Sequence, residues 1–145
     1  MLTSQKIESV DYDLFNLDRV FGAYILPGLK ALRLEQIGAS NVDNEDVPAY
    51  MSVGLIDYER QVERWNYVLD EMIHAFESLN TSWESDVLIN GWEIIIANGR
   101  PELRKPGTGN YSRPWTTPQD MIRLYRDRIS NGFLLFGKYY QELWK

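Results

Sequence analysis

The chain has 145 residues, a formal net charge of −6 and no cysteine. Its length fits a single domain with a sizeable hydrophobic core, and the missing cysteines exclude disulfides, thiolate zinc sites and cysteine nucleophiles. The negative charge argues against general nucleic-acid binding, because phosphate backbones repel it.

Residues 1–15 show no clear period. They lack the basic start and apolar stretch of a signal peptide, and no run in the chain approaches the roughly 20 apolar residues of a membrane span. We therefore expect an intracellular protein with no membrane partner. Four apolar residues of this region are able to pack as an extended arm: Val10, Tyr12, Leu14 and Phe15.

Residues 16–35 have the period of a first helix, which Asn16 is able to cap. The apolar stripe consists of Leu17, Val20, Phe21, Tyr24, Ile25, Leu29 and Leu32. Pro27 lies inside this stripe, where it removes a backbone hydrogen bond. We expect either a kinked helix or two short helices.

Residues 37–55 contain glycines, a proline and polar residues, and we interpret them as a connection. Their acidic run, 43–46, lacks the ligand spacing of a helix–loop–helix calcium site, so we do not expect a metal there. A connection of this length is uncommon. We expect it to pack on a neighbouring subunit or to carry a short helical turn.

Residues 57–79 have the cleanest helical pattern in the chain, with apolar residues at Tyr58, Val62, Trp65, Val68, Leu69, Met72, Ile73, Phe76 and Leu79. The single histidine, His74, lies between Glu71 and Glu77 at three-residue spacing. Helical bundles present diiron ligands in Glu-x-x-His motifs, but they draw two such motifs from different helices. We keep Glu71, His74 and Glu77 as candidate metal ligands and favour a structural role for His74.

Residues 80–116 are the hardest to assign. Asn90 and Gly91 stand between two apolar runs, which is typical of a β-hairpin turn, but Ile94, Ile95 and Ile96 do not alternate by face. For residues 87–96 a hairpin and a short buried helix remain equally open. Several glycines and prolines follow, and we expect residues 97–116 to form a loop.

Residues 117–145 predict a long C-terminal helix, which begins with Thr117 as a cap and Pro118 in its first position. Its apolar stripe consists of Met121, Ile122, Tyr125, Ile129, Phe133, Phe136, Tyr140, Leu143 and Trp144. Gly132 and Gly137 lie inside this helix. Each of them indicates either a close backbone approach or a kink, unless it is simply tolerated.

The charges are unevenly distributed along the chain. Residues 57–86 hold eight acids and two bases, a balance of −6, whereas residues 100–128 hold seven bases and three acids, a balance of +4. These segments are able to pair within one subunit or across a subunit boundary. The alternative is that both are solvated helix faces.

Three stretches occur in this order: NLDRVFGAYILPGLKALR (16–33), VLDEMIHAFE (68–77) and RISNGFLLFGKYYQELWK (128–145). In them, about a third of its length, the chain resembles a family of uncharacterised proteins encoded by tailed bacteriophages and prophages. The resemblance implies a phage origin and a location in the host cytoplasm. It implies no activity, cofactor or catalytic residue. It also implies that an aromatic residue is more usual than histidine at position 74.

The sequence therefore predicts a mainly α-helical single domain, residues 1–145. We expect a bundle of two long helices and a kinked N-terminal helix, with an irregular or β-hairpin insertion at residues 80–116. No catalytic constellation is present, and we expect no cofactor. Four aromatic residues are candidate interface or core anchors: Trp65, Phe133, Tyr139 and Trp144.

For function we favour a non-enzymatic homo-oligomeric structural or interaction protein, because long helices with aromatic stripes suit symmetric assembly. One alternative is a small acidic phage factor that binds and modulates a host protein, in which the acids of residues 57–86 would cluster on one surface. The second alternative is a small-molecule or metal-dependent enzyme with its site in the helical bundle.

Overall fold

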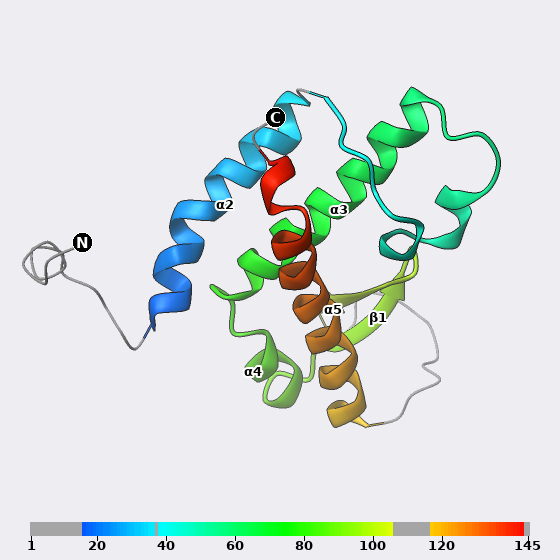
Figure 1. Ribbon diagram of the computed structural model, residues 1–145. Coiled ribbons are helices and arrows are strands. Elements are labelled where there is room, and N and C mark those ends of the chain that lie inside the picture. The colour runs from blue at the N-terminus through cyan, green and yellow to red at the C-terminus, as the bar shows by residue number, and fades with distance from the viewer. Residues whose placement is uncertain (1–15, 37, 106–116, 144–145) are drawn as a thin grey trace, which may run out of the picture.

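The computed structural model describes residues 16–36, 38–105 and 117–143. These residues form a mainly helical structure with one small antiparallel sheet of two strands, as the sequence predicts (Figure 1). In chain order the elements are α2 (Leu17–Glu35), η2 (Asn44–Asp46), η3 (Ala49–Ser52), α3 (Tyr58–Ser78), α4 (Trp83–Leu88), β1 (Glu93–Ala97), β2 (Arg100–Arg104), α5 (Pro118–Lys138) and η4 (Tyr140–Glu142). None of the helices in the described ranges is long and apolar enough to cross a bilayer.

Helix α2 is one continuous helix through Pro27, so the alternative of two short helices is wrong. Proline leaves the carbonyl of Ala23 without its usual intrahelical donor. Because Ala23 and Pro27 are both exposed, water is able to satisfy that carbonyl. The helix ends at Gln36, which adopts a left-handed conformation (φ 49°) and donates its N–H to the Leu32 carbonyl.

The connection that follows α2 carries the short helical turns η2 and η3, one of the two outcomes expected for it. Its apolar residues Val42, Val47 and Met51 are buried in the main core together with residues of α3 and α5. The connection therefore packs on its own chain through these three side chains.

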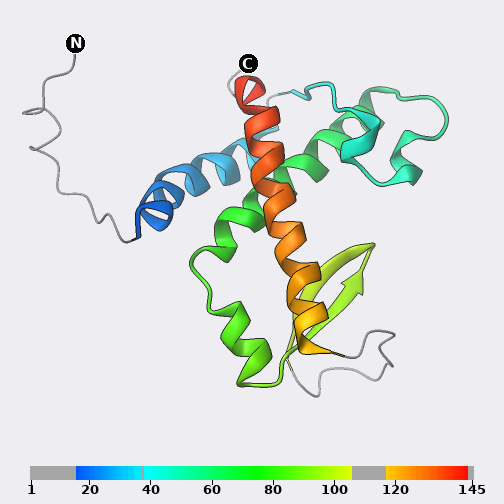
Figure 2. The ribbon, with the colours of Figure 1, turned by 60° about the horizontal axis from the view of Figure 1, so that its bottom comes forward.

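Helix α3 begins where the sequence predicts. The Asp57 side chain accepts a hydrogen bond from the backbone N–H of Arg60 at 2.9 Å, and this satisfies one of the free donors of the first turn. The predicted stripe supplies most of the core, with Trp65, Val68, Leu69, Met72 and Phe76 all buried. Helix α3 packs on both α2 and α5 (Figures 1 and 2).

Gly132 is the point of closest approach between α3 and α5. A Cβ atom at Gly132 would collide with the backbone oxygen of Glu71 and would lie 2.6 Å from the Ala75 Cβ. Gly137 has open space around it, with nothing within 4 Å of the same added atom. The structure thus assigns close approach to Gly132 alone.

Helix α5 is capped as predicted, because the Thr117 hydroxyl accepts the N–H of Asp120 at 3.1 Å. The prediction that it continues to residue 145 is wrong, since it ends at Lys138 and is followed by η4. The break occurs at Tyr139, which is buried and has non-helical backbone angles (φ −103°, ψ 16°). Tertiary contacts of its hydroxyl, described below, hold it there.

The small sheet forms a hairpin at a different place from the one expected. Asn98 and Gly99 both have positive φ (54° and 78°), as a two-residue type I′ turn requires, and they join β1 to β2. The earlier Asn90–Gly91 pair instead terminates α4, where the Asn90 side chain donates to the Asp86 carboxylate at 3.0 Å.

Residues 87–96 are consequently divided between the end of α4 and most of β1, so neither of the two expected assignments holds for the whole segment. The expectation of a loop over residues 97–116 is wrong for 97–105, which contain the turn and β2. Pro101 is tolerated in β2 because both strands of a two-stranded sheet are edge strands. Ile94 is fully buried and belongs to a second core with α4 and α5.

Candidate functional site

The three candidate metal ligands of α3 point to different partners. Glu71 is buried and pairs with Arg128 of α5 (Nε–Oε2 2.9 Å) and with Arg100 of β2 (Nε–Oε1 3.2 Å, too oblique for a hydrogen bond). Glu77 is exposed and lies 3.6 Å from the Lys30 ammonium of α2. The three residues therefore do not gather into a metal-binding group in the part of the chain that the structure describes.

His74 packs edge-on against the Tyr125 ring, with the ring centroids 5.2 Å apart. Its Nε2 has no hydrogen-bond partner among the described residues. Burial, together with the positive charges of Arg128 and Arg100, lowers the pKa of His74 to about 4. The imidazole is therefore neutral at pH 7 and packs as an aromatic ring.

Arg128 joins three elements of the fold. Besides Glu71, it donates to the Pro101 carbonyl at 2.8 Å and lies 3.0 Å from the Glu102 carboxylate, both in β2. Arg126 pairs with Glu84 at 3.1 Å. Ion pairs between the acidic segment and the basic segment thus form within one chain, the first of the arrangements expected for them.

The acidic run of the connection surrounds a lysine of α5. The Lys138 ammonium lies 2.9 Å from Asp43, 3.0 Å from Glu45 and 2.7 Å from Asp46. Hydrogen bonds to these carboxylates raise the pKa of Lys138 above its usual range. The three carboxylates are the one group of the described chain with the spacing of metal ligands, and the Lys138 ammonium that lies among them offsets one of their three negative charges.

Tyr139 ties the same run to the end of α5. Its hydroxyl donates to the Asp46 carboxylate at 2.5 Å and accepts the backbone N–H of Asp43 at 3.0 Å. Burial, and then the hydrogen bond to Asp46, raise the pKa of Tyr139 to about 12. The tyrosine therefore stays protonated and acts as a clamp between the connection and α5.

The predicted anchors differ in their positions. Trp65 and Tyr139 are buried in the main core, with their ring centroids 6.0 Å apart. Phe133 is partly buried against Phe76 at 5.0 Å. Trp144 lies outside the described residues. Core packing accounts for the contacts of the three anchors that the structure describes.

Arg64 is a structural residue that the sequence analysis did not single out. It is buried on α3, and its guanidinium donates to the Met51 carbonyl and the Ser52 hydroxyl, both at 3.0 Å. It also donates to the Val42 carbonyl and to the Asn44 side chain. One side chain thus holds both halves of the connection against α3.

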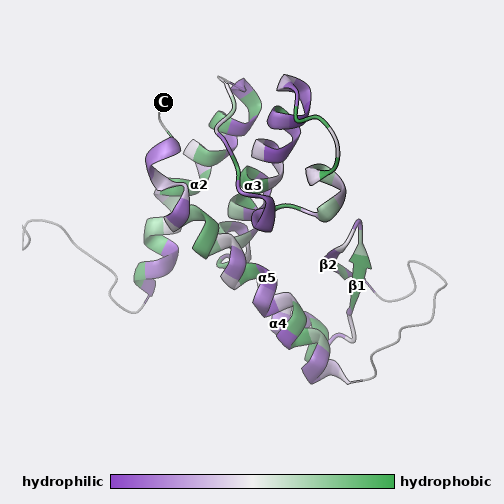
Figure 3. Cartoon of the chain, turned by 45° about the vertical axis from the view of Figure 1, so that its right-hand side comes forward, coloured by the Kyte–Doolittle hydropathy of each residue, from purple (hydrophilic) through white to green (hydrophobic). Residues whose placement is uncertain are grey.

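The end of this connection and the first residue of α3 form what we call the apolar segment, residues 50–58. Five of its large apolar side chains are between 41% and 86% exposed: Tyr50, Val53, Leu55, Ile56 and Tyr58. In Figure 3 hydrophobic colouring lies on the loop that leads to α3 and stops at the first turn of the helix. Sequence reasoning missed this surface, although six large apolar residues in a nine-residue stretch around Gly54 were a visible signal.

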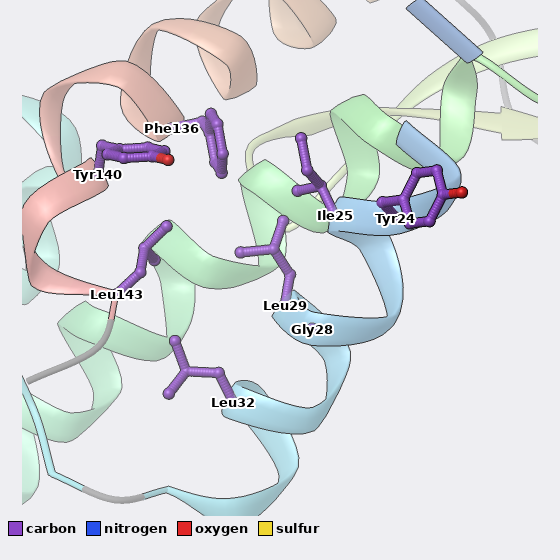
Figure 4. Close-up of a pocket in the computed structure, with 8 residues that line it drawn as sticks. All are labelled: Tyr24, Ile25, Gly28, Leu29, Leu32, Phe136, Tyr140 and Leu143. Carbon is purple, nitrogen blue, oxygen red and sulfur yellow. The ribbon is translucent and has the colours of Figure 1, made fainter. Parts of the chain in front are cut away.

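A second apolar surface is concave. A hollow of about 330 Å³ lies between α2 and the end of the described chain (Figure 4). We call it the apolar hollow, and its lining consists of Tyr24, Ile25, Gly28, Leu29, Leu32, Phe136, Tyr140 and Leu143. The leucines point toward a common space, and the Tyr24 ring stands at its outer edge. Leu29 belongs to the main core and Ile25, Leu32, Phe136 and Leu143 pack against it, so the hollow lies where the core reaches the surface.

Comparison of the chain with protein-family models, with curated proteins and with solved structures gives no match.

Proposed function

We propose that this chain is a non-enzymatic interaction protein that assembles with copies of itself. The observation that carries the proposal is the apolar segment, residues 50–58, in which five large apolar side chains are exposed to water. Isolated exposed apolar residues are common, but a contiguous patch marks an interaction surface.

The size of the segment supports this role. Its exposed fractions correspond to about 450 Å² of apolar surface, taking about 200 Å² for a whole tyrosine and about 100 Å² for an aliphatic side chain. This lies within the range of about 300–600 Å² for the largest patch on a typical monomer, which is often functional. A partner would remove this surface from water.

The charge distribution favours self-assembly over the acidic host-protein modulator. Four acids of residues 57–86 are paired with bases of other elements: Asp70 with Arg33, Glu71 with Arg128, Glu77 with Lys30, and Glu84 with Arg126. These pairs face α2, α5 and β2, so the acids are distributed around the molecule. They do not offer the single negative surface that such a modulator would use.

In this proposal α3 and α5 are the two long helices of a small bundle, with α2 packed on α3. Support comes from the contacts of α3 with both neighbours and from the close approach at Gly132. The resemblance to phage-encoded proteins would place the assembly in the cytoplasm of an infected host. No activity is needed for such a role.

The test is the mass of the purified protein by light scattering and native mass spectrometry over a series of concentrations. We expect a defined oligomer for the wild type and a monomer for Leu55→Asp, with unchanged helical content by circular dichroism. Leu134→Asp is the matched control, because Leu134 is exposed on α5 and belongs to neither apolar surface. It should assemble like the wild type.

A wild type that is monomeric at every concentration would contradict the proposal. Extra mass retained in the native spectrum would instead indicate a bound ligand or metal and would favour the enzyme alternative. Loss of assembly in Leu134→Asp as well would show that any added charge disrupts it, and the apolar segment would then have no special role.

A further inference from the structure

We infer that the apolar segment of one copy seats in the apolar hollow of the next copy. The inference rests on the proposed self-assembly and adds which surface meets which. Each chain would then both offer a segment and receive one. Unlike surfaces that pair in this way form a ring if the rotation between neighbouring copies closes, and an open filament if it does not.

The two surfaces are complementary in shape. Leu55 is 86% exposed and Tyr58 is 65% exposed, so these side chains project from the protein. The hollow is recessed between α2 and the end of α5, and its volume of about 330 Å³ lies within the usual range for pockets, about 300–1,000 Å³. A projecting surface fills a recess, whereas two projecting surfaces touch only at their tips.

The two surfaces lie at different ends of α3, so one chain does not fill its own hollow. Helix α2 is joined to the C-terminal half of α3, through Arg33 to Asp70 (2.8 Å) and Lys30 to Glu77. The apolar segment leads into the first turn of α3. At about 1.5 Å per residue, Tyr58 is about 18–28 Å from these two contacts along the helix axis.

The combined area suits a stable contact. The segment supplies about 450 Å² of apolar surface, and the two exposed aromatic residues that line the hollow, Tyr24 and Tyr140, supply about 250 Å² by the same conversion. If apolar atoms make up about 60% of an interface, the total is about 1,200 Å². This is the lower limit of the standard size class of specific complexes, about 1,200–2,000 Å². Two hollows facing each other would leave their recessed area uncovered.

The decisive experiment uses one variant for each surface. Gly28→Tyr fills the hollow, and nothing lies within 4 Å of the Cβ position to oppose it. Leu55→Asp disables the segment. Gly137→Tyr is the matched control, because Gly137 is also a helical glycine in open space but does not line the hollow. Circular dichroism and the melting temperature check that each variant is folded.

We expect Gly28→Tyr and Leu55→Asp to be monomeric when each is alone, and Gly137→Tyr to assemble like the wild type. An equimolar mixture of the two monomeric variants should form a one-to-one heterodimer in native mass spectrometry, because each retains the surface that the other lacks. If Gly28→Tyr does not fold, Tyr24→Asp at the edge of the hollow replaces it.

The outcomes separate the two proposals. A monomeric wild type would overturn both of them. An oligomeric wild type with an unchanged Gly28→Tyr variant would overturn this inference and leave self-assembly standing. Two monomeric variants that do not associate when mixed would show that an intact apolar segment does not bind an intact apolar hollow, and this would also overturn the inference.

Discussion

Replacing Gly132 with alanine should separate the packing of α3 against α5 from the intrinsic preference of the helix. In an exposed helix interior, Gly→Ala stabilises by about 1 kcal/mol. At Gly132 the added Cβ meets the backbone oxygen of Glu71 and lies 2.6 Å from the Ala75 Cβ. Backbone cannot rotate away, and overpacking of this kind costs about 1–3 kcal/mol or more.

The expected net effect of Gly132→Ala is a loss of up to about 2 kcal/mol in the free energy of unfolding, after the gain in helix preference is subtracted. Gly137→Ala is the control and should gain up to about 1 kcal/mol, because nothing lies within 4 Å of its Cβ position. The two variants should therefore differ by about 1–3 kcal/mol, which is the overpacking cost at Gly132.

The measurement is urea unfolding followed by circular dichroism, at one fixed protein concentration because association with a second copy would shift the midpoint. The slope of the unfolding curve should be the same for both variants. If Gly132→Ala is as stable as Gly137→Ala, then α3 and α5 are not as close as the structure shows. The account of Gly132 as a packing residue would fail with it.

Three further predictions concern other parts of the core. His74 has a folded pKa of about 4, below its usual 6.5, so its contribution is complete above pH 6.5 and lost as the pH falls toward 4. Because His74 is only partly buried, solvent screening reduces its contribution to the free energy of unfolding to about 1–2 kcal/mol. His74→Phe should remove that part of the acid destabilisation measured between pH 7 and pH 4.5, and an unfolding free energy that falls equally with pH in both proteins would contradict the prediction. Arg64→Met should lower the free energy of unfolding by about 3 kcal/mol, because it leaves buried carbonyls unpaired. Hydrogen exchange should become faster in the connection and nowhere else. Unchanged exchange there would argue against the role of Arg64 in holding the connection against α3. Leu135→Ala should lower the free energy of unfolding by about 3 kcal/mol, because Leu135 is buried. Phe136 is half-buried, so Phe136→Ala should lower it by less in the same urea titration. The reverse order would mean that α5 turns a different face toward the core.

Local chemistry was sufficient to predict where the long helices begin. Thr117 caps α5 as expected, and Asp57, where the pattern of α3 begins, also caps its helix, because an N-cap requires only a side-chain oxygen within reach of the next free amides. Asn16, the cap expected for the first helix, makes no side-chain cap hydrogen bond. The helical stripe of α3 also became core as predicted. These features depend on neighbours within a few residues, so a single sequence contains them.

The place of the hairpin could not be read in this way. Two Asn-Gly pairs are present, and both suit the same turn, so local preference does not choose between them. In the structure Asn90 bonds to Asp86 and ends α4, whereas Asn98 and Gly99 form the turn. The choice depends on burying Ile94 against α4 and α5, which are contacts over a longer range.

The candidate metal ligands show the same limit. Their spacing places Glu71 and Glu77 about 120° apart around one helix, and the bases that pair with them come from β2, α5 and α2. The partner of a charged side chain is set by which elements pack beside it. The sequence indicated the charges and not their pairing.

The sequence by itself determined the helical class, the starts of α3 and α5 and the two glycines within α5. Only the tertiary structure decided that Gly132 meets another backbone while Gly137 faces open space. It also decided which apolar residues remain uncovered, in the apolar segment and the apolar hollow. The physical reason is that periodicity tells which residues share a face of a helix, whereas burial depends on whether another element lies against that face.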